Sequence, residues 1–395
     1  MNYIEREITA KLGEYAGTFP VVYLTGPRQS GKSTLLKHVF STYRHVNLEE
    51  KDIREFALAD PRGFLNGLSL PAIIDEAQYA PDLFSYIQSI VDKHDEPGMF
   101  ILSGSQNFLM LKSIYQSLAG RVGILSLLPF SNRELSAADK LRDDTNEWLL
   151  AGHYPRQAMR AISPADFYSN YIKTYVERDI HLEIGVQKID GFTSFLRICA
   201  ANVGSPINLS SIGSSIGIDA RTVASWINIL EESYLAFRLK PYTKSLAKRY
   251  SKTPKLYFYD TGLLCNLLGV KTSADVVRSS KRGQIFENAI ITDYYKHRYN
   301  KGDFPNDNTF FWRDSSVREK EVDLIIEQAN HLALYEIKAS QTAKAKYADN
   351  LLLFERNMSG LNARRPKCTK TVIYDGPHNL TVKGTTFINR CDVQY

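Results

Sequence analysis

VVYLTGPRQSGKST, residues 21–34, is the stretch that decides the fold of the amino-terminal part of the chain. An apolar run suited to a buried strand leads into GPRQSGKS (residues 26–33), which fits the pattern G-x-x-x-x-G-K-[ST]. A helical pattern follows. In this setting the loop's N–H groups and the positive end of the helix dipole surround phosphate oxygens. The stretch therefore predicts a phosphate-binding loop (P-loop) in an α/β fold.

The residues of this loop have separate expected roles. Gly26 and Gly31 permit the tight backbone path. Lys32 is expected to reach the β- and γ-phosphates of ATP as a catalytic residue, and Ser33 to be a ligand of Mg²⁺. The residues expected to contact the nucleotide are Gly26, Pro27, Arg28, Gln29, Ser30, Gly31, Lys32, Ser33 and Thr34.

A second apolar strand pattern, PAIIDEAQ (residues 71–78), ends in two acidic residues. Asp75 is placed to hold the Mg²⁺ shell, and Glu76 to polarise the attacking water as a catalytic residue. The alternative for Glu76 is a surface carboxylate at the end of a strand. A further strand ends in LSGSQ, where Ser105 or Gln106 is a candidate sensor of the γ-phosphate.

The first 130 residues alternate short apolar runs with helical patterns, as βαβ units do. The runs lie at 21–26, 45–49, 71–76, 99–105 and 122–130. Such runs predict a parallel sheet covered by helices on both faces.

From about residue 131 to 270 the pattern is mostly helical. A short helix over 210–216, a glycine-bearing turn and an amphipathic helix over about 220–233 predict a helix-turn-helix. An apolar strand and the basic segment 240–255 come next and resemble a wing. The second helix carries polar residues suited to contacting DNA, namely Arg221, Thr222, Ser225 and Asn228. The alternative is a helical packing module without a role in nucleic-acid binding.

The carboxy-terminal part is rich in strand patterns, and one of them, LALYEIKAS (332–340), contains Glu336 and Lys338 on one side of an apolar strand. A hairpin turning near Asn330 would bring Asp323 beside Glu336, and Glu287 lies on the preceding helical segment. The order Glu…Asp…Glu-x-Lys resembles the core of PD-(D/E)XK nucleases. That resemblance implies Mg²⁺ bound by Glu287, Asp323 and Glu336, with Lys338 activating the attacking water. The alternative is an ion pair on an exposed strand face.

Over nearly its whole length the chain resembles a family of bacterial and archaeal AAA+-like P-loop ATPases with an uncharacterised carboxy-terminal module. Beyond the motifs above, the resemblance is carried by SLAGRV, LPFSNREL, YIKTYVERDI and TPKLYFYDTGLL. It implies an α/β protein with an AAA+-like parallel sheet at 1–135, a helical and winged-helix domain at 136–270, and a restriction-endonuclease-like α/β domain at 271–395. HYPRQ (153–157) stands where relatives often have a Gly-Gly segment.

The same resemblance implies that Arg121 in LAGRV is an arginine finger, a catalytic residue reaching a neighbouring subunit. We therefore expect a ring-like homo-oligomer, for example a hexamer. The alternative is that Arg121 pairs locally within its own chain.

Charge, hydropathy and cysteine spacing indicate where the protein is expected to act. The net charge is +6, no apolar run is long enough to span a membrane, and the four cysteines lie far apart without a metal-binding spacing. These features favour a cytoplasmic protein with reduced thiols. The leading hypothesis is an ATP-hydrolysing ATPase that binds DNA, including branched DNA. The alternatives are an ATP-gated, Mg²⁺-dependent nuclease and a nucleotide-dependent scaffold that binds protein.

Overall fold

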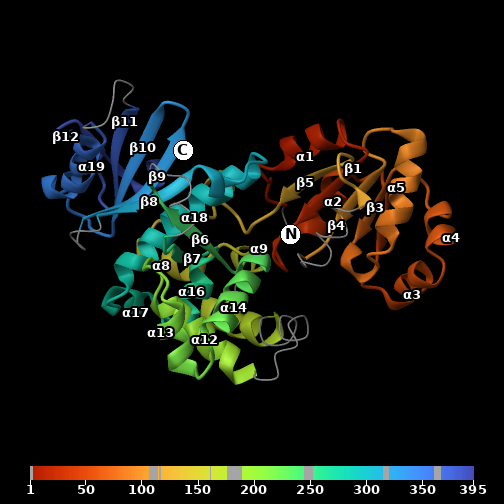
Figure 1. Ribbon diagram of the computed structural model, residues 1–395, viewed down its shortest axis with the longest axis horizontal. Helices are drawn as coiled ribbons and strands as arrows, with labels where there is room; N and C mark the ends of the chain where they lie inside the picture. The colour runs from red at the N-terminus through yellow and green to blue at the C-terminus, as the bar shows by residue number, and fades with distance from the viewer. Residues whose placement is uncertain are drawn as a thin grey trace.

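The computed structural model describes residues 3–105, 114, 117–160, 162–175, 189–243, 252–314, 320–359 and 366–395. Two β-sheets lie at opposite ends of the molecule, and a helical region lies below and between them (Figure 1). The amino-terminal sheet has five strands and the carboxy-terminal sheet has eight. Gln106, a candidate γ-phosphate sensor, lies outside the described residues.

The five-stranded sheet is parallel throughout, in the order β2-β3-β4-β1-β5. Its strands are β1 (Val21–Thr25), β2 (Arg44–Asn47), β3 (Ala72–Asp75), β4 (Phe100–Ser103) and β5 (Val122–Ser126). The helices around it are α1 (Thr9–Ala16), α2 (Lys32–Val39), α3 (Lys51–Ala59), α4 (Pro61–Asn66) and α5 (Leu83–His94), with the 3₁₀ turn η1 (Ala77–Tyr79). Parallel strands end at one edge, so the loops after β1, β3 and β4 lie together there.

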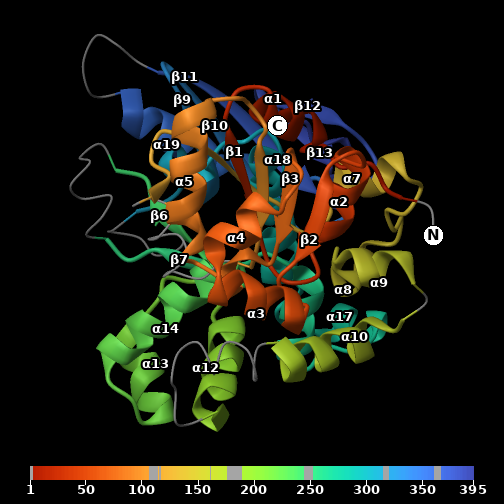
Figure 2. The ribbon, with the colours of Figure 1, turned by 90° about the vertical axis from the view of Figure 1, so that its right-hand side faces the viewer.

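Alternate residues of this sheet face different helices. Val21 and Tyr23 belong to the core that includes α5, whereas Val22 and Leu24 belong to the core that includes α1 and α2. Because helices cover both faces of the sheet, residues 21–24 of β1 are apolar without interruption. The predicted doubly covered parallel sheet is confirmed. Figure 2 shows this part of the molecule facing the viewer, above α12, α13 and α14.

The middle of the chain is helical, as expected. Its helices are α7 (Asn132–Ala137), α8 (Thr145–Ala151), α9 (Pro155–Met159), α10 (Pro164–Tyr171), α12 (Ile189–Ala201), α13 (Leu209–Ile216), α14 (Ala220–Glu232), α16 (Thr261–Leu267) and α17 (Ser273–Arg278). Gly217 turns the chain between α13 and α14 with a φ of 72°, and the Asp219 side chain caps α14. Trp226 of α14 packs on Phe195 of α12, with ring centroids 5.3 Å apart. The predicted helix-turn-helix is therefore present.

The eight-stranded sheet takes strands from both sides of residue 270. It contains β6 (Ala236–Pro241), β7 (Lys255–Phe258), β8 (Thr309–Arg313), β9 (Glu321–Gln328), β10 (His331–Lys338), β11 (Lys367–Tyr374), β12 (Leu380–Val382) and β13 (Thr385–Asn389). The wing-like hairpin of β6 and β7 is joined to the rest because β6 also pairs with β8 in parallel. The basic segment 240–255 therefore ends inside a sheet, and Lys255 is buried.

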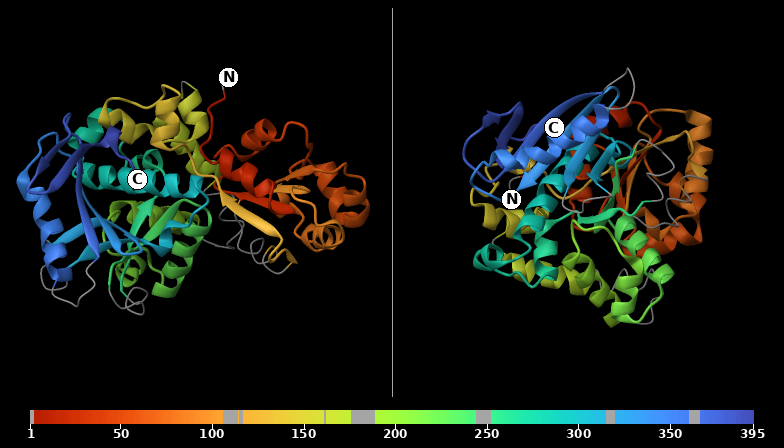
Figure 3. Two further views of the ribbon diagram at one scale, coloured as in Figure 1. Left: turned by 90° about the horizontal axis from the view of Figure 1, so that it is seen from above. Right: turned by 60° about the vertical axis from the view of Figure 1, so that its left-hand side comes forward.

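Two helices cover opposite faces of this sheet. α18 (Arg282–Asn300) packs on one face, and α19 (Asp349–Ser359) packs on the other. α18 also contacts β5, so it runs from the carboxy-terminal sheet to the edge of the amino-terminal one (Figure 3, left). Short 3₁₀ turns are η3 (Pro305–Asp307), η4 (Ala345–Ala348) and η5 (Arg390–Asp392).

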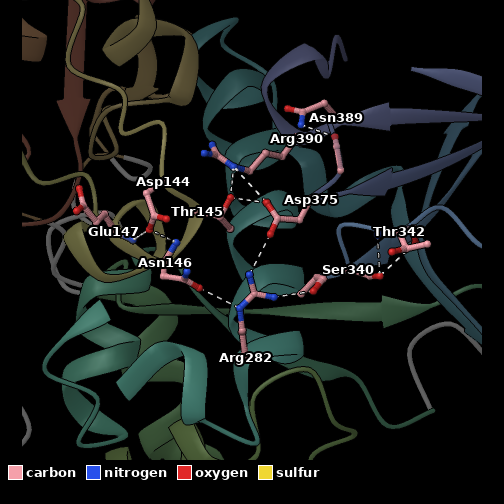
Figure 4. A network of polar contacts seen from close by, with 12 residues as sticks. Asp144, Thr145, Asn146, Glu147, Arg282, Ser340, Thr342, Asp375, Asn389 and Arg390 are labelled. Carbon is pink, nitrogen blue, oxygen red and sulfur yellow. Dashed lines mark hydrogen bonds and ion pairs between the residues drawn. The ribbon is translucent and has the colours of Figure 1, made fainter. Parts of the chain in front are cut away.

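A polar network fastens α8 and α18 to the ends of β10 and β11 (Figure 4). Arg282 donates to Asn146 Oδ1, Ala339 O and Asp375 Oδ2 at 3.0, 2.6 and 2.9 Å. Arg390 donates to Thr145 Oγ1 at 2.9 Å. These bonds tie the helical region to the carboxy-terminal sheet. Within the described ranges, no helix is both long and apolar enough to cross a bilayer.

Candidate functional site

The P-loop has the backbone that its glycines allow. Gly26 has a φ of 144°, and a Cβ there would lie 2.2 Å from the carbonyl oxygen of Leu127. Gly31 has a φ of 97° immediately before α2 begins at Lys32. Any other residue at position 26 would collide with the backbone of Leu127, directly after β5. The loop therefore wraps the amino end of α2, where backbone N–H groups lack partners inside the helix.

Lys32 is buried beneath this loop. Its Nζ donates to the carbonyl oxygens of Gly26 and Pro27 at 2.9 and 3.0 Å. Burial lowers the pKa of Lys32 to about 8, although the nearby Glu76 and Asp75 carboxylates act in the opposite direction. Within the described residues no carboxylate lies within ion-pair distance of its ammonium group. The cation therefore has only neutral partners that phosphate oxygens could replace.

Asp75 is the last residue of β3, and Glu76 follows it at the same edge. Burial works against ionisation of Asp75, but His45, Ser103 and Ser33 outweigh it and lower the pKa of Asp75 to about 2. The carboxylate is therefore charged at neutral pH, beside the hydroxyl of the expected Mg²⁺ ligand Ser33.

Glu76 is oriented by a residue that sequence reasoning missed. Gln78 Nε2 donates to Glu76 Oε2 at 2.5 Å and to Ser105 Oγ at 3.1 Å. The other amide atom, Gln78 Oε1, is buried and has no hydrogen-bond partner in the described part of the chain. Gln78 thus connects the end of β3 to the end of β4. The one sequence feature that could have indicated its role is its position in PAIIDEAQ, two residues after Glu76.

A pocket of about 750 Å³ opens beside the loop. Its lining comes from three parts of the chain: the P-loop and Glu76, the amino-terminal segment, and residues around α9 and α10. The lining residues outside the predicted set include Tyr3, Ile4, Arg6, Glu49, Phe130, Pro155, Arg156, Met159, Arg160, Thr174 and Tyr175. Arg156 and Arg160 bring two positive charges to the mouth of the pocket. Arg156 lies in HYPRQ (153–157), a stretch to which the sequence alone assigns no role.

The amino-terminal segment holds the P-loop in place through Arg6. The buried Arg6 guanidinium donates to Ser30 O, Leu128 O and Glu134 Oε1 at 3.0, 2.6 and 2.9 Å. Glu134 is itself fixed by the capping box that starts α7 at Ser131. One wall of the pocket is thus built from residues about 130 positions apart.

Arg121 forms a bidentate ion pair with Asp92 at the surface of its own chain. Its Nε donates to Asp92 Oδ1, and its Nη2 lies 3.2 Å from Asp92 Oδ2. It is absent from the lining of the pocket of its own chain. Its role in a neighbouring subunit stays a prediction, since only a second chain could test it.

The four residues of the nuclease-like motif come together at β9, β10 and α18. Continuing the β9–β10 register by one residue puts Glu336 opposite Asp323. Lys338 Nζ lies 2.6 Å from Glu336 Oε1 and 3.6 Å from Asp323 Oδ2. A further acidic residue, Glu321, was not anticipated: oxygen atoms of Glu287, Glu321 and Asp323 lie within 4.8 Å of one another.

A second lysine enters this group from β7. Lys255 Nζ lies 3.3 Å from Glu287 Oε1 and contacts Glu321 Oε1. Tyr257 OH also donates to Glu287 Oε1, at 2.5 Å. Burial raises the pKa of Glu287 to about 6 and that of Glu336 well above its ordinary range. We call Glu287, Glu321, Asp323, Glu336, Lys255 and Lys338 the carboxylate–lysine cluster.

The donor set of this cluster has the oxygen ligands that Mg²⁺ prefers, and Glu336 Oε2 is buried without a partner among the described residues. However, the Lys255 ammonium already contacts two of the three carboxylates that would hold the ion, Glu287 and Glu321. The residues as arranged therefore do not fit a metal ion, and no cleavage step follows from them.

Comparison with known families agrees with the arrangement of the amino-terminal sheet. Residues 18–136 match a family model described as an AAA domain. The five-stranded part is AAA-like. Residues 142–274 and 282–391 each match a domain of unknown function, DUF8612 and DUF4143 respectively. The expected AAA-like P-loop architecture is thereby confirmed, and the matches leave the nuclease-like assignment a prediction.

The chain is also similar to two uncharacterised mycobacterial proteins. Mb2031c of Mycobacterium bovis and Rv2008c of Mycobacterium tuberculosis are each 29% identical over 386 residues, covering 96% of this chain and 82% of theirs. The similarity therefore extends through all three matched regions.

Similar solved structures include a Walker-type ATPase of Pyrococcus abyssi, with 17% identity and a TM-score of 0.42, covering 67% of this chain and 96% of that one. AMPPCP-bound DnaA from Aquifex aeolicus has 14% identity and a TM-score of 0.30, covering 57% of this chain and 86% of that one.

Proposed function

We propose that the chain binds and hydrolyses ATP with Mg²⁺ and uses this reaction to act on DNA, including branched DNA, as a homo-oligomer. The observation that carries the ATPase part is the pocket beside Lys32. It combines a buried ammonium that donates to two carbonyl oxygens, an ionised Asp75 and an oriented Glu76.

Each residue of the pocket has a separate task in this proposal. Lys32 would exchange its two carbonyl partners for phosphate oxygens, and Ser33 and Asp75 would hold Mg²⁺, which supplies charge neutralisation between the phosphates. Gln78 keeps Glu76 aimed at the pocket, where Glu76 would orient a water molecule and accept its proton. Arg156 and Arg160, which also line the pocket, would balance the negative charge of the triphosphate.

The test of the ATPase proposal is nucleotide binding and phosphate release with three variants. Lys32→Ala should lose binding, whereas Glu76→Gln should retain binding and lose hydrolysis. Lys37→Ala is the matched control, because Lys37 lies exposed on the same helix α2 and should behave as wild type. Wild-type protein that takes up no labelled ATP would refute the proposal.

The DNA part of the proposal rests on the helix-turn-helix. α14 buries Val223, Trp226 and Ile227 and exposes Arg221 and Ser225 on its other side. An exposed polar face on the second helix is how such motifs meet a DNA groove. Thr222 and Asn228 are less available, because Thr222 Oγ1 donates to Asp219 and Asn228 Oδ1 accepts from Arg238.

DNA binding is tested by fluorescence anisotropy with duplex and branched DNA across a salt series. Arg221→Ala should weaken binding, and loss of a phosphate contact should lower the slope of log affinity against log salt by about 1. Arg278→Ala, which removes an exposed arginine from α17, is the matched control. If neither DNA binds at low salt but ATP changes the assembly state, the scaffold hypothesis is favoured instead.

The oligomer part depends on Arg121 acting in the neighbouring subunit. Two inactive variants, Lys32→Ala and Arg121→Ala, are mixed. If the sites are shared, some interfaces will combine an intact P-loop with an intact Arg121, and ATPase activity will return. Mixtures as inactive as their components would show that Arg121 serves its own chain, in keeping with its pair with Asp92. The nuclease hypothesis remains a prediction that requires a metal ion to displace Lys255.

A further inference from the structure

We infer that Lys255 is a built-in cation that takes the place of a divalent metal ion among Glu287, Glu321 and Asp323, so that the carboxylate–lysine cluster is closed to metal. This inference does not depend on the proposed ATPase function. It concerns a different part of the molecule, and the contacts of four separate elements carry it: β7, α18, β9 and β10.

The position of the ammonium group is the first argument. Three carboxylates approach within 4.8 Å of one another, the spacing that a shared cation produces. The Lys255 Nζ contacts two of them, Glu287 and Glu321. It also lies 5.2 Å from the centroid of the Phe311 ring, whose face attracts a cation. A metal ion binding the same oxygens would meet a positive charge already in place.

The backbone around Lys255 is the second argument. β7 pairs with β6 on one side, with Lys255 opposite Leu239. On the other side Pro206 forms a bridge with Lys255, and Gly204 N donates to Leu256 O at 3.0 Å. The side chain is 1% exposed. Lys255 therefore cannot swing into solvent unless the segment around Gly204 opens.

The distribution of charge is the third argument. Three cations are shared among four carboxylates: Lys255 lies between Glu287 and Glu321, and Lys338 lies between Asp323 and Glu336. The third, Arg313, lies with its Nε 3.3 Å from Glu321 Oε2, so Glu287 depends on Lys255 more than Glu321 does. Removing an ammonium from such a group leaves buried negative charge without compensation, which is costly. A metal ion that displaced Lys255 would leave a buried lysine without a partner instead. The arrangement is thus complete without metal, and it joins β7 to α18 and β9.

The test is Mn²⁺ binding measured by electron paramagnetic resonance on nucleotide-free full-length protein. All chains carry Asp75→Asn to silence the P-loop site. The background protein and its Glu321→Gln variant should bind equally little Mn²⁺. Lys255→Met should gain about one Mn²⁺ per chain, and the double variant Lys255→Met with Glu321→Gln should lose that gain. Lys252→Met is the matched control, because Lys252 is exposed three residues away and should change nothing.

Two results would overturn the inference. One is Mn²⁺ bound by the background protein and lost with Glu321→Gln, which would show that metal enters despite Lys255. The other is a folded Lys255→Met protein without Mn²⁺, which would show that the carboxylates do not form a cation site. Should Lys255→Met fail to fold, the comparison of the background protein with Glu321→Gln still decides whether the cluster is closed to metal.

Discussion

Lys32 and Lys255 are both buried lysines close to carboxylates, yet they lie in opposite electrostatic settings. Lys32 Nζ is held by two carbonyl oxygens, and burial lowers its pKa to about 8. Lys255 is equally buried, but Glu287 and Glu321 outweigh that burial and raise its pKa. The first ammonium group has no direct anionic partner among the described residues, whereas the second has two.

The difference shows how a buried cation can serve binding or structure. An ammonium held by neutral oxygens costs stability but can gain strongly from an incoming phosphate. An ammonium already paired with carboxylates contributes to stability and has little left to offer a ligand. Five substitutions test this contrast, from the largest expected effect to the smallest.

Lys255→Met should lower the free energy of unfolding by about 3–5 kcal/mol, because it leaves buried carboxylates without their counter-charge. Chemical or thermal denaturation without nucleotide measures this effect. Added Mn²⁺ should restore part of the loss, and exposed Lys252→Met should have almost none. An unchanged stability would mean that the cluster does not depend on Lys255.

Lys32→Met should affect ATP binding rather than stability. Removing a desolvated ammonium should leave stability unchanged or higher, while affinity for ATP falls by about 10- to 150-fold, corresponding to the 1.5–3 kcal/mol of a hydrogen bond to a charged group. Denaturation and nucleotide titration of the same preparation measure both quantities. Destabilisation as large as that of Lys255→Met would remove the contrast between the two lysines.

Arg156→Ala and Arg160→Ala should each weaken ATP binding by about tenfold, or about 1.4 kcal/mol, if these two lining residues compensate the charge of the triphosphate. Calorimetric titration of ATP checks this expectation. Arg133→Ala is a suitable control, since Arg133 is 76% exposed and absent from the pocket lining. Wild-type affinity for ATP in both variants would show that neither arginine contributes to binding the triphosphate.

Asp293 on α18 is expected to have the smallest effect, and its carboxylate accepts a hydrogen bond from the backbone N–H of Asn132. Burial raises its pKa to about 6, and the backbone N–H of Asn132 and the Lys296 ammonium only partly offset this effect. The folded chain therefore holds the proton more tightly than the unfolded chain, so this residue's contribution to stability increases as pH falls from about 7 to about 4.

Asp293→Asn should remove that part of the pH dependence and stabilise the protein at pH 8 by about 1 kcal/mol. Denaturation at pH 5 and pH 8, as a difference from wild type, measures it. A larger gain at pH 5 than at pH 8 would contradict the assigned cause.

Much of the candidate nucleotide site could be predicted because its residues are close in sequence. The P-loop is one contiguous turn, and Asp75 and Glu76 lie at the end of a strand whose apolar pattern is clear. Gln78 was missed because its function depends on Ser105, which follows another strand, β4. Arg6 and Arg156 were missed because nothing local connects an amino-terminal segment or α9 to a loop more than twenty residues away.

The sequence by itself determined the parallel sheet, the helix-turn-helix and the β9–β10 hairpin, since each follows from local periodicity and turn residues. Only the tertiary structure decided that Lys255 lies beside Glu287 and Glu321, which are 32 and 66 residues away along the chain. Local patterns report which face of an element is apolar, but not which distant charge it meets. That pairing depends on how β6 joins β8 and how α18 packs across the sheet, and it sets the electrostatic difference between the two lysines.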